Sequence, residues 1–148
     1  MTAANHAVTG SLVAVAIGNP VLALSAALAS HFVLDSLPHW DYKLEPRLQR
    51  LALIADVAFS FSPLLLLSVL FNDSASLIII GGLLGMAPDA LWLPDILRGK
   101  PSPMAKKTLL HWLRRAHQKI QWSERPWGWI VELVWFIGTL VVLVALVT

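Results

Sequence analysis

The sequence predicts an all-α fold, a polytopic membrane helix bundle of about five transmembrane segments plus one amphipathic interfacial helix. Of the 148 residues, 57% are hydrophobic and only 14% are charged, whereas soluble domains carry about 25% charged residues. The hydrophobic residues form long blocks such as Leu64–Leu70 and Leu140–Val147, which are typical of membrane-spanning helices. The chain has no cysteine, so thiolate zinc sites are excluded and any metal must be held by His, Asp or Glu.

Five hydrophobic segments are expected, at about residues 3–17, 21–37, 51–71, 75–93 and 126–147. The turn-forming residues Gly18-Asn19-Pro20 separate the first two. Both of these are shorter than the roughly 20 residues of a full span, so residues 3–37 form either two spans or one kinked span. Pro63 favours a kink in the third segment. We expect residues 1–148 to form a single membrane domain.

The polar stretch 94–125 separates the fourth and fifth segments, and within it Lys106–Gln121 has the pattern of an amphipathic helix. A stripe containing tryptophan beside basic residues is typical of a helix at the membrane interface; the alternative is a surface helix packed on the bundle. The histidines of this helix, His111 and His117, are expected to be solvated. The residues of the apolar face are Leu109, Trp112, Leu113, Ala116 and Ile120.

The distribution of basic residues predicts the orientation in the membrane. If every segment crosses, the N-terminus and residues 38–50 and 94–125 share one side. Those regions hold all 11 Lys and Arg residues, at positions 43, 47, 50, 98, 100, 106, 107, 114, 115, 119 and 125. Because basic loops stay in the cytoplasm, we expect a cytoplasmic N-terminus and a C-terminus on the opposite side.

Several ionisable residues lie inside the hydrophobic segments, close to the predicted cytoplasmic ends: His6, Asp35, Asp56, Asp89 and Glu132. An ionisable group in a spanning helix costs a few kcal/mol unless it is paired or solvated. Several such groups at a similar depth therefore predict one polar pocket open to the cytoplasm. The alternatives are local: a helix–helix contact for Asp56, a helix cap for Asp89, an ion pair with Arg125 for Glu132, and a headgroup position for His6.

The most specific local pattern surrounds the end of the second segment. His31 and Asp35 are four residues apart and share a helix face, and Pro38 can turn His39 and Asp41 back over it. Imidazole and carboxylate ligands suit a divalent metal ion such as zinc; the alternative is a hydrogen-bonded helix pair. The candidates for holding one or two ions are His6, His31, Asp35, His39, Asp41, Asp56, Asp89, His117 and Glu132.

The stretch Ser30–Asp41 resembles the motif of the membrane-bound metal-dependent hydrolases, small bacterial inner-membrane proteins that include a group under LexA control. His6–Gly10 and Gly85–Asp89 are also similar to segments of that family. The family's later His-Arg-Gly-x-x-His-Ser run has no counterpart in this chain. The resemblance implies a bacterial inner-membrane location. It also implies metal-ligand roles for His6, His31, Asp35 and Asp89, with His39 and Asp41 as further candidates.

These features predict a metal-dependent hydrolase that acts at the cytoplasmic membrane face. A divalent ion lowers the pKa of a bound water, and Asp56 or Glu132 is the expected catalytic base. The basic helix suits an anionic headgroup, so the expected substrate is a lipid-like phosphoester and the expected partner is membrane lipid. A non-enzymatic metal-binding or ion-translocating protein and a structural membrane protein are the alternatives. No nucleic-acid partner is expected, because no nucleic-acid-binding motif accompanies the basic residues.

Overall fold

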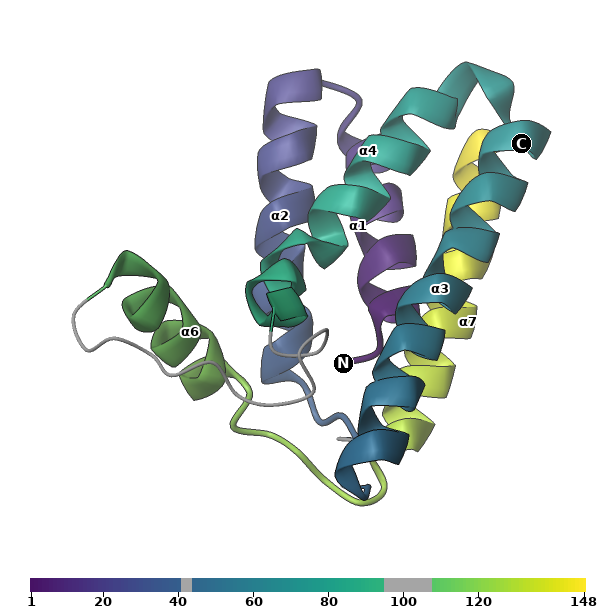
Figure 1. The fold of residues 1–148 in the computed structure, drawn as a ribbon. Coiled ribbons are helices and arrows are strands. Elements are labelled where there is room, and N and C mark those ends of the chain that lie inside the picture. Colours follow the sequence, from purple (N-terminus) through teal and green to yellow (C-terminus); the bar gives the residue numbers. More distant parts are fainter. Residues whose placement is uncertain (41–43, 95–107) are drawn as a thin grey trace.

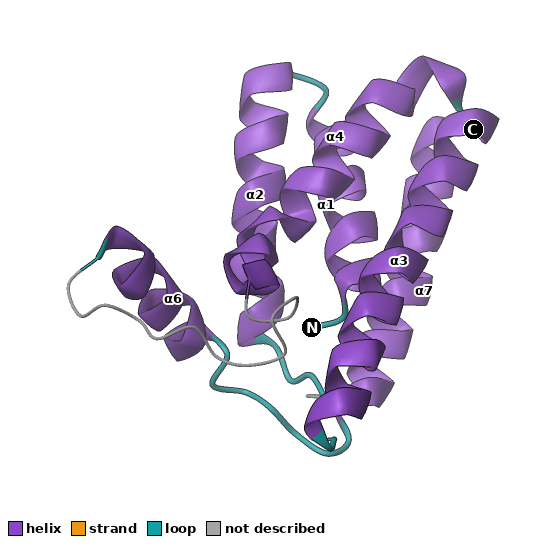
Figure 2. Cartoon of the chain, in the orientation of Figure 1, coloured by secondary structure: helices purple, strands orange, loops and turns teal. Residues whose placement is uncertain are grey.

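The computed structural model describes residues 1–40, 44–94 and 108–148, and these form an all-α fold without β-strands (Figures 1 and 2). The predicted all-α class is confirmed for these ranges. Two short 3₁₀ helices flank α4: η1 (Asn72–Ser74) precedes it and η2 (Ala87–Trp92) follows it. The α-helices are α1 (Ala3–Ile17), α2 (Pro20–Ser36), α3 (Pro46–Leu70), α4 (Ala75–Met86), α6 (Leu109–Ile120) and α7 (Gly128–Val147).

Three helical runs in the described ranges are long and apolar enough to cross a membrane: α3, the continuous run Asn72–Trp92 and α7. At about 1.5 Å per residue, the 25 residues of α3 reach roughly 37 Å, which exceeds the ~30 Å of a bilayer's hydrocarbon core. The 15 residues of α1 reach only about 22 Å. The chain is therefore consistent with a membrane protein, and the count of five spans is not established because α1 and α2 are short.

A sharp turn separates α1 from α2. Gly18 has a φ of 68°, in the left-handed region that glycine adopts without steric cost, and its N–H donates to the Ala14 carbonyl. The Asn19 side chain then accepts from the Leu22 N–H, and Pro20 occupies the first turn of α2. Residues 3–37 thus form two antiparallel helices (Figure 1) and not one kinked helix.

Helix α1 lies at the centre of the bundle, against α2, α3, α4 and α7. Its closest neighbour is α4, because glycines face each other there: a methyl group on Gly10 would collide with the Gly81 carbonyl, and one on Gly85 with the His6 carbonyl. Ser11 Oγ also donates to the Ile78 carbonyl at 2.7 Å. Small residues of this kind let membrane helices approach backbone to backbone.

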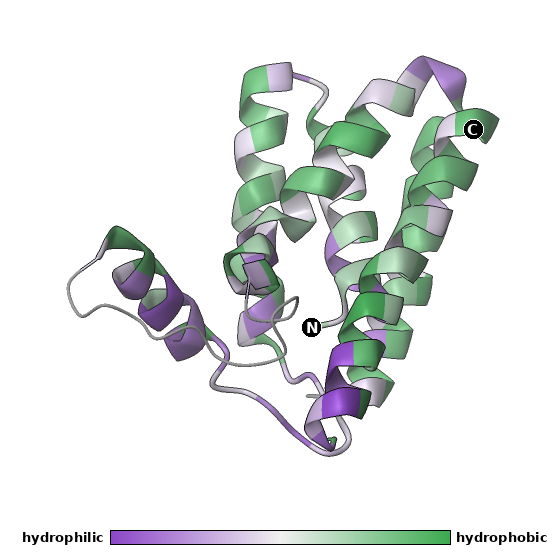
Figure 3. Cartoon of the chain, viewed as in Figure 1, coloured by the Kyte–Doolittle hydropathy of each residue, from purple (hydrophilic) through white to green (hydrophobic). Residues whose placement is uncertain are grey.

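The chain runs up and down the bundle, so its connections are divided between two ends (Figure 1). The N-terminus, the α2–α3 connection and the α6–α7 connection lie at one end; the α1–α2 turn, η1 and the C-terminus lie at the other. Hydrophilic residues gather at the first end and on α6 (Figure 3). This grouping of the connections agrees with the predicted one. Which end faces the cytoplasm remains a prediction.

Candidate metal centre

Helix α2 carries the first two residues of a buried polar cluster near the end of the bundle where the N-terminus lies. His31 and Asp35 are one turn apart, and both side chains are completely buried. The His31 Nε2 atom lies 3.2 Å from Asp35 Oδ2. His31 and Asp35 therefore share one helix face, as predicted.

The other ring nitrogen of His31 determines which atom faces the cluster. His31 Nδ1 lies 2.8 Å from the carbonyl oxygen of Gly85. Because a carbonyl can only accept, Nδ1 carries a proton, and in the neutral imidazole the lone pair of Nε2 then points at the cluster. A histidine held in this way by a backbone carbonyl is typical of metal ligands. Helix α4, which carries Gly85, packs against α2 as well as α1, and this brings the carbonyl within reach of His31.

Helix α6 contributes His117, which is only 1% exposed. Its Nε2 atom lies 2.8 Å from Asp35 Oδ2 and 3.1 Å from His31 Nε2. The expectation that His117 is solvated was wrong. Arg114, three residues earlier on the same face, is also buried; it donates to the Leu91 carbonyl and stacks over the Trp92 ring. The amphipathic pattern carried no signal for this burial, because Arg114 and His117 lie on the polar side of the helix, among its other basic residues.

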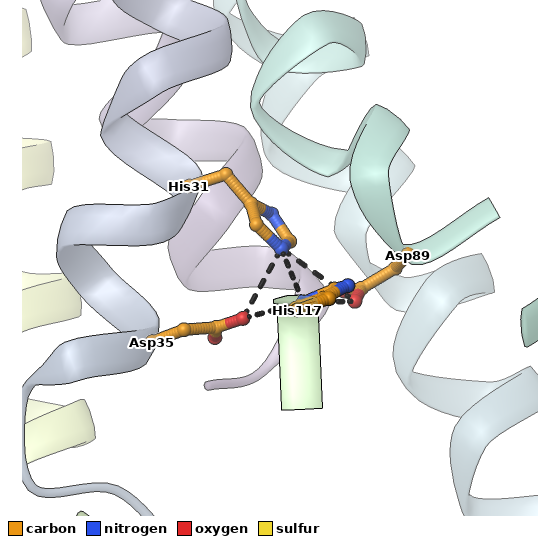
Figure 4. Close-up of side chains that lie close together, drawn as sticks. All are labelled: His31, Asp35, Asp89 and His117. Atoms are coloured by element: carbon orange, nitrogen blue, oxygen red, sulfur yellow. Dashed lines mark hydrogen bonds and ion pairs between the residues drawn. The ribbon is translucent and has the colours of Figure 1, made fainter. Parts of the chain in front are cut away.

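Asp89, from η2, completes the group at its edge (Figure 4). Its Oδ1 atom lies 3.7 Å from the Nε2 atoms of both His31 and His117. The Asp89 side chain is 35% exposed, whereas the other three are buried. Asp89 therefore marks the side on which the cluster opens.

Five of the six separations among these four ligand atoms are close to those around a tetrahedral metal ion. Bonds of about 2.0–2.1 Å to zinc place tetrahedral ligands roughly 3.3 Å apart. The five distances given above run from 2.8 to 3.7 Å, and all four atoms lie within 4.8 Å of one another. Two imidazole nitrogens and two carboxylate oxygens form a donor set that zinc and similar divalent ions accept. This buried group could therefore hold a metal ion.

His6 borders the cluster without belonging to this group of four. Its ring stacks on that of His31 with centroids 4.0 Å apart, and its Nε2 lies 3.1 Å from Asp35 Oδ1. The α-amino group of Met1 lies 2.9 Å from the same oxygen. The two oxygens of Asp35 thus face different neighbours. Oδ1 faces His6 and the N-terminus, and Oδ2 faces His31 and His117 and accepts from the Gln121 side-chain amide at 3.2 Å.

Asp56 and Glu132, the expected catalytic bases, lie outside this group of four and accept backbone N–H groups. Asp56 Oδ2 accepts the Ala3 N–H at 2.8 Å, and Glu132 accepts the N–H groups of Thr2 and Trp40 at 3.0 and 2.8 Å. Both carboxylates thus bind the backbone at the start of α1. They line a mainly apolar cavity of about 700 Å³ whose walls include none of the four clustered residues. The alternative for Asp56, a polar contact between helices, matches this geometry.

The remaining two candidates do not join the cluster in the described residues. His39 Nδ1 donates to the Leu37 carbonyl at 2.8 Å. The backbone of His39 pairs with the segment before α7, accepting from Arg125 N at 2.8 Å. His39 therefore joins two connections at the end of the bundle. Asp41 lies outside the described residues.

The arrangement combines a pre-oriented imidazole, two further buried ligands and one carboxylate at an open edge, all inside an apolar bundle. Such a group can bind a divalent cation and present it to a molecule that approaches from the open edge. No protein-family model, curated protein or solved structure matches this chain.

Proposed function

We propose that the chain is a membrane-embedded, metal-dependent hydrolase that cleaves a phosphoester of a lipid-like substrate at the cytoplasmic edge of a bacterial inner membrane. The observation that carries the proposal is the cluster of His31, Asp35, His117 and Asp89 in an apolar bundle, whose ligand atoms all lie within 4.8 Å of one another. The resemblance of residues 30–41 to the membrane-bound metal-dependent hydrolases supports the same assignment. Zinc is the expected ion, because imidazole and carboxylate groups are among its usual ligands.

In this proposal, His31, Asp35 and His117 hold the ion. Their ligand atoms are the closest together, at 2.8–3.2 Å, and catalytic zinc sites characteristically use three protein ligands and leave one position open. An ion bound there would act as a Lewis acid and would lower the pKa of a water molecule bound to it.

Asp89 replaces Asp56 and Glu132 as the proposed base. It is the half-exposed member of the cluster, and it lies 3.7 Å from both imidazole nitrogens. A carboxylate at that position can take the proton of the attacking water. Asp56 and Glu132 are less suited to this role because their oxygens already accept backbone N–H groups.

The proposed substrate class follows from the surroundings of the cluster. It lies near the end of the bundle where hydrophilic residues gather (Figure 3), and Arg115 and Lys119 are exposed on α6. Basic side chains at a membrane edge attract anionic headgroups, and the apolar helix surfaces alongside accommodate acyl chains. A phosphoester that joins a headgroup to a lipid anchor has both features.

The proposal is tested on protein reconstituted in nanodiscs that contain phosphatidylglycerol. Elemental analysis should find a stoichiometric divalent metal in the wild type and in His111→Ala, and little in His31→Ala, Asp35→Ala and His117→Ala. His111 is the matched control, because it lies on α6 outside the group of four. The wild type should also hydrolyse a lipid phosphoester, and Asp89→Asn should retain metal while losing most of that turnover.

Two outcomes would separate the alternatives. If all three ligand variants retained the metal, the proposed metal centre would be wrong, and the proposed hydrolase activity would fall with it. A metal that depends on the cluster, without turnover of any lipid phosphoester, ester or amide, would leave a non-enzymatic metal-binding protein.

A further inference from the structure

Helix α6 has three different faces. The face towards the bundle carries Arg114 and His117, the two buried side chains of this helix. A second, apolar face carries Leu109, Trp112, Leu113 and Ala116, which share one side at about 3.6 residues per turn. A third face is polar and includes the exposed basic residues Arg115 and Lys119.

The described part of the bundle leaves the apolar face exposed. Leu109 is 75% exposed, Trp112 58% and Leu113 46%. Neither buried side chain of α6 is apolar, so the hydrophobic effect contributes little to the attachment of this helix to the protein. The main neighbours of α6 among the described elements are α2 and η2, which it contacts at the cluster. A helix held mainly by polar contacts, with an open apolar face, needs another apolar surface.

The position and charge of α6 indicate which surface that is. The helix stands beside α2 near the end where hydrophilic residues gather, at the margin of an apolar bundle (Figures 1 and 3). Trp112 and the neighbouring Trp122 are both well exposed there, and tryptophan favours the bilayer interface. Arg115 and Lys119 flank the apolar face, so their charge is complementary to that of anionic phospholipid headgroups.

We propose that the apolar face of α6 docks into the anionic lipid interface of the membrane crossed by the bundle, and that this docking holds His117 in the metal centre. The docking rests on the surface of α6 alone; its effect on the metal also rests on the proposed metal centre. Because His117 reaches Asp35 and His31 from a helix with little apolar packing of its own, lipid supplies the missing apolar contact. Metal affinity then depends on the membrane surface.

The absence of cysteine allows a direct test of docking. Leu113→Cys and Gln118→Cys, on the apolar and polar faces of α6, are each labelled with the fluorophore NBD. The proteins are reconstituted in phosphatidylglycerol–phosphatidylcholine vesicles that contain doxyl-labelled lipid. At least threefold stronger quenching is expected at position 113 than at position 118. Equal quenching at both positions, or a label at 113 shielded by a second copy of the chain, would overturn the docking.

The effect on the metal centre is tested with a charge-matched pair of variants, Leu113→Glu and Gln118→Glu. Both positions are exposed, so both variants should fold, which size-exclusion chromatography checks. In phosphatidylglycerol nanodiscs, Leu113→Glu should bind Zn²⁺ about tenfold more weakly than the wild type, and Gln118→Glu should differ from the wild type by less than twofold. Equal affinity in the two variants would overturn the coupling. If the wild type bound no Zn²⁺, the proposed metal centre and its coupling to the membrane would both be wrong. The quenching experiment would still test whether α6 docks into the membrane.

Discussion

Two groups of acids lie within the helices of this bundle, and they differ in what surrounds their oxygens. Asp56 and Glu132 accept backbone N–H groups from Thr2, Ala3 and Trp40. Around Asp35, by contrast, imidazole nitrogens from three separate helices lie at 2.8–3.2 Å, beside the α-amino group of Met1 and the side-chain amide of Gln121. The first arrangement is complete without a ligand, because carboxylates satisfy the free N–H groups and the dipole at a helix start. The second brings electron-pair donors together, as a cation requires. Burial of an acid in a membrane helix therefore does not by itself mark a catalytic site.

The largest effect is expected from Asp35→Asn. This substitution keeps the size of the side chain and removes the charge that both His31 and His117 face. Zn²⁺ affinity should fall about 100-fold or more, because metal ligation by carboxylate requires the ionised form. Isothermal titration calorimetry in nanodiscs measures this change. An affinity within threefold of that of the wild type would show that the cluster is only a hydrogen-bond network.

Gly85→Ala should produce the next largest effect. The added methyl group would collide with the His6 carbonyl, and any shift of Gly85 moves the carbonyl that orients His31. Loss of such an orienting contact lowers metal affinity by about 10- to 100-fold. Gly138→Ala in α7 is the matched control, because a methyl group there meets nothing within 4 Å. Unchanged Zn²⁺ affinity in Gly85→Ala would show that the close helix packing at Gly85 does not affect metal binding.

Glu132→Gln should affect stability and leave the metal centre intact. Both carboxylate oxygens of Glu132 accept N–H groups, and a glutamine must turn its own NH₂ group towards one of them. An unsatisfied buried donor costs about 1–3 kcal/mol, which should appear as a lower unfolding temperature in detergent. Zn²⁺ affinity should stay within twofold of that of the wild type. A loss of turnover at full metal occupancy and unchanged stability would restore Glu132 as a catalytic candidate.

The smallest effect is expected from Asp56→Asn. The asparagine carbonyl can still accept from Ala3 N, so only the attraction between the carboxylate charge and the start of α1 is lost. That interaction is worth about 0.3–1 kcal/mol, again measured as a change in thermal stability. Turnover should be unchanged. Destabilisation larger than that of Glu132→Gln would contradict the ranking of the two acids.

Part of the candidate site could be predicted from local spacing. His31 and Asp35 are one helical turn apart, so any helix brings them to one face, and Asp89 follows a Pro-Asp segment at the end of a hydrophobic run. His117 could be included only as a candidate, since it is 82 residues from Asp35 and its helix could have turned that face to water. The hydrogen bonds of Asp56 and Glu132 depend on where the start of α1 lies. The spacing of residues within one segment does not show that position.

The sequence by itself determined the all-α class, the positions of the hydrophobic helices and the end of the bundle at which basic residues gather. These follow from hydropathy, from Gly18 and Pro20 at one turn, and from the cost of charge in lipid. Only the tertiary structure decided which buried polar groups meet. Gly10, Gly81 and Gly85 let α1 and α4 pack closely, and the packing of α2 against α4 sets the Gly85 carbonyl beside His31. Contacts between helices depend on how the helices pack in three dimensions. That packing cannot be predicted directly from the order of residues along the chain.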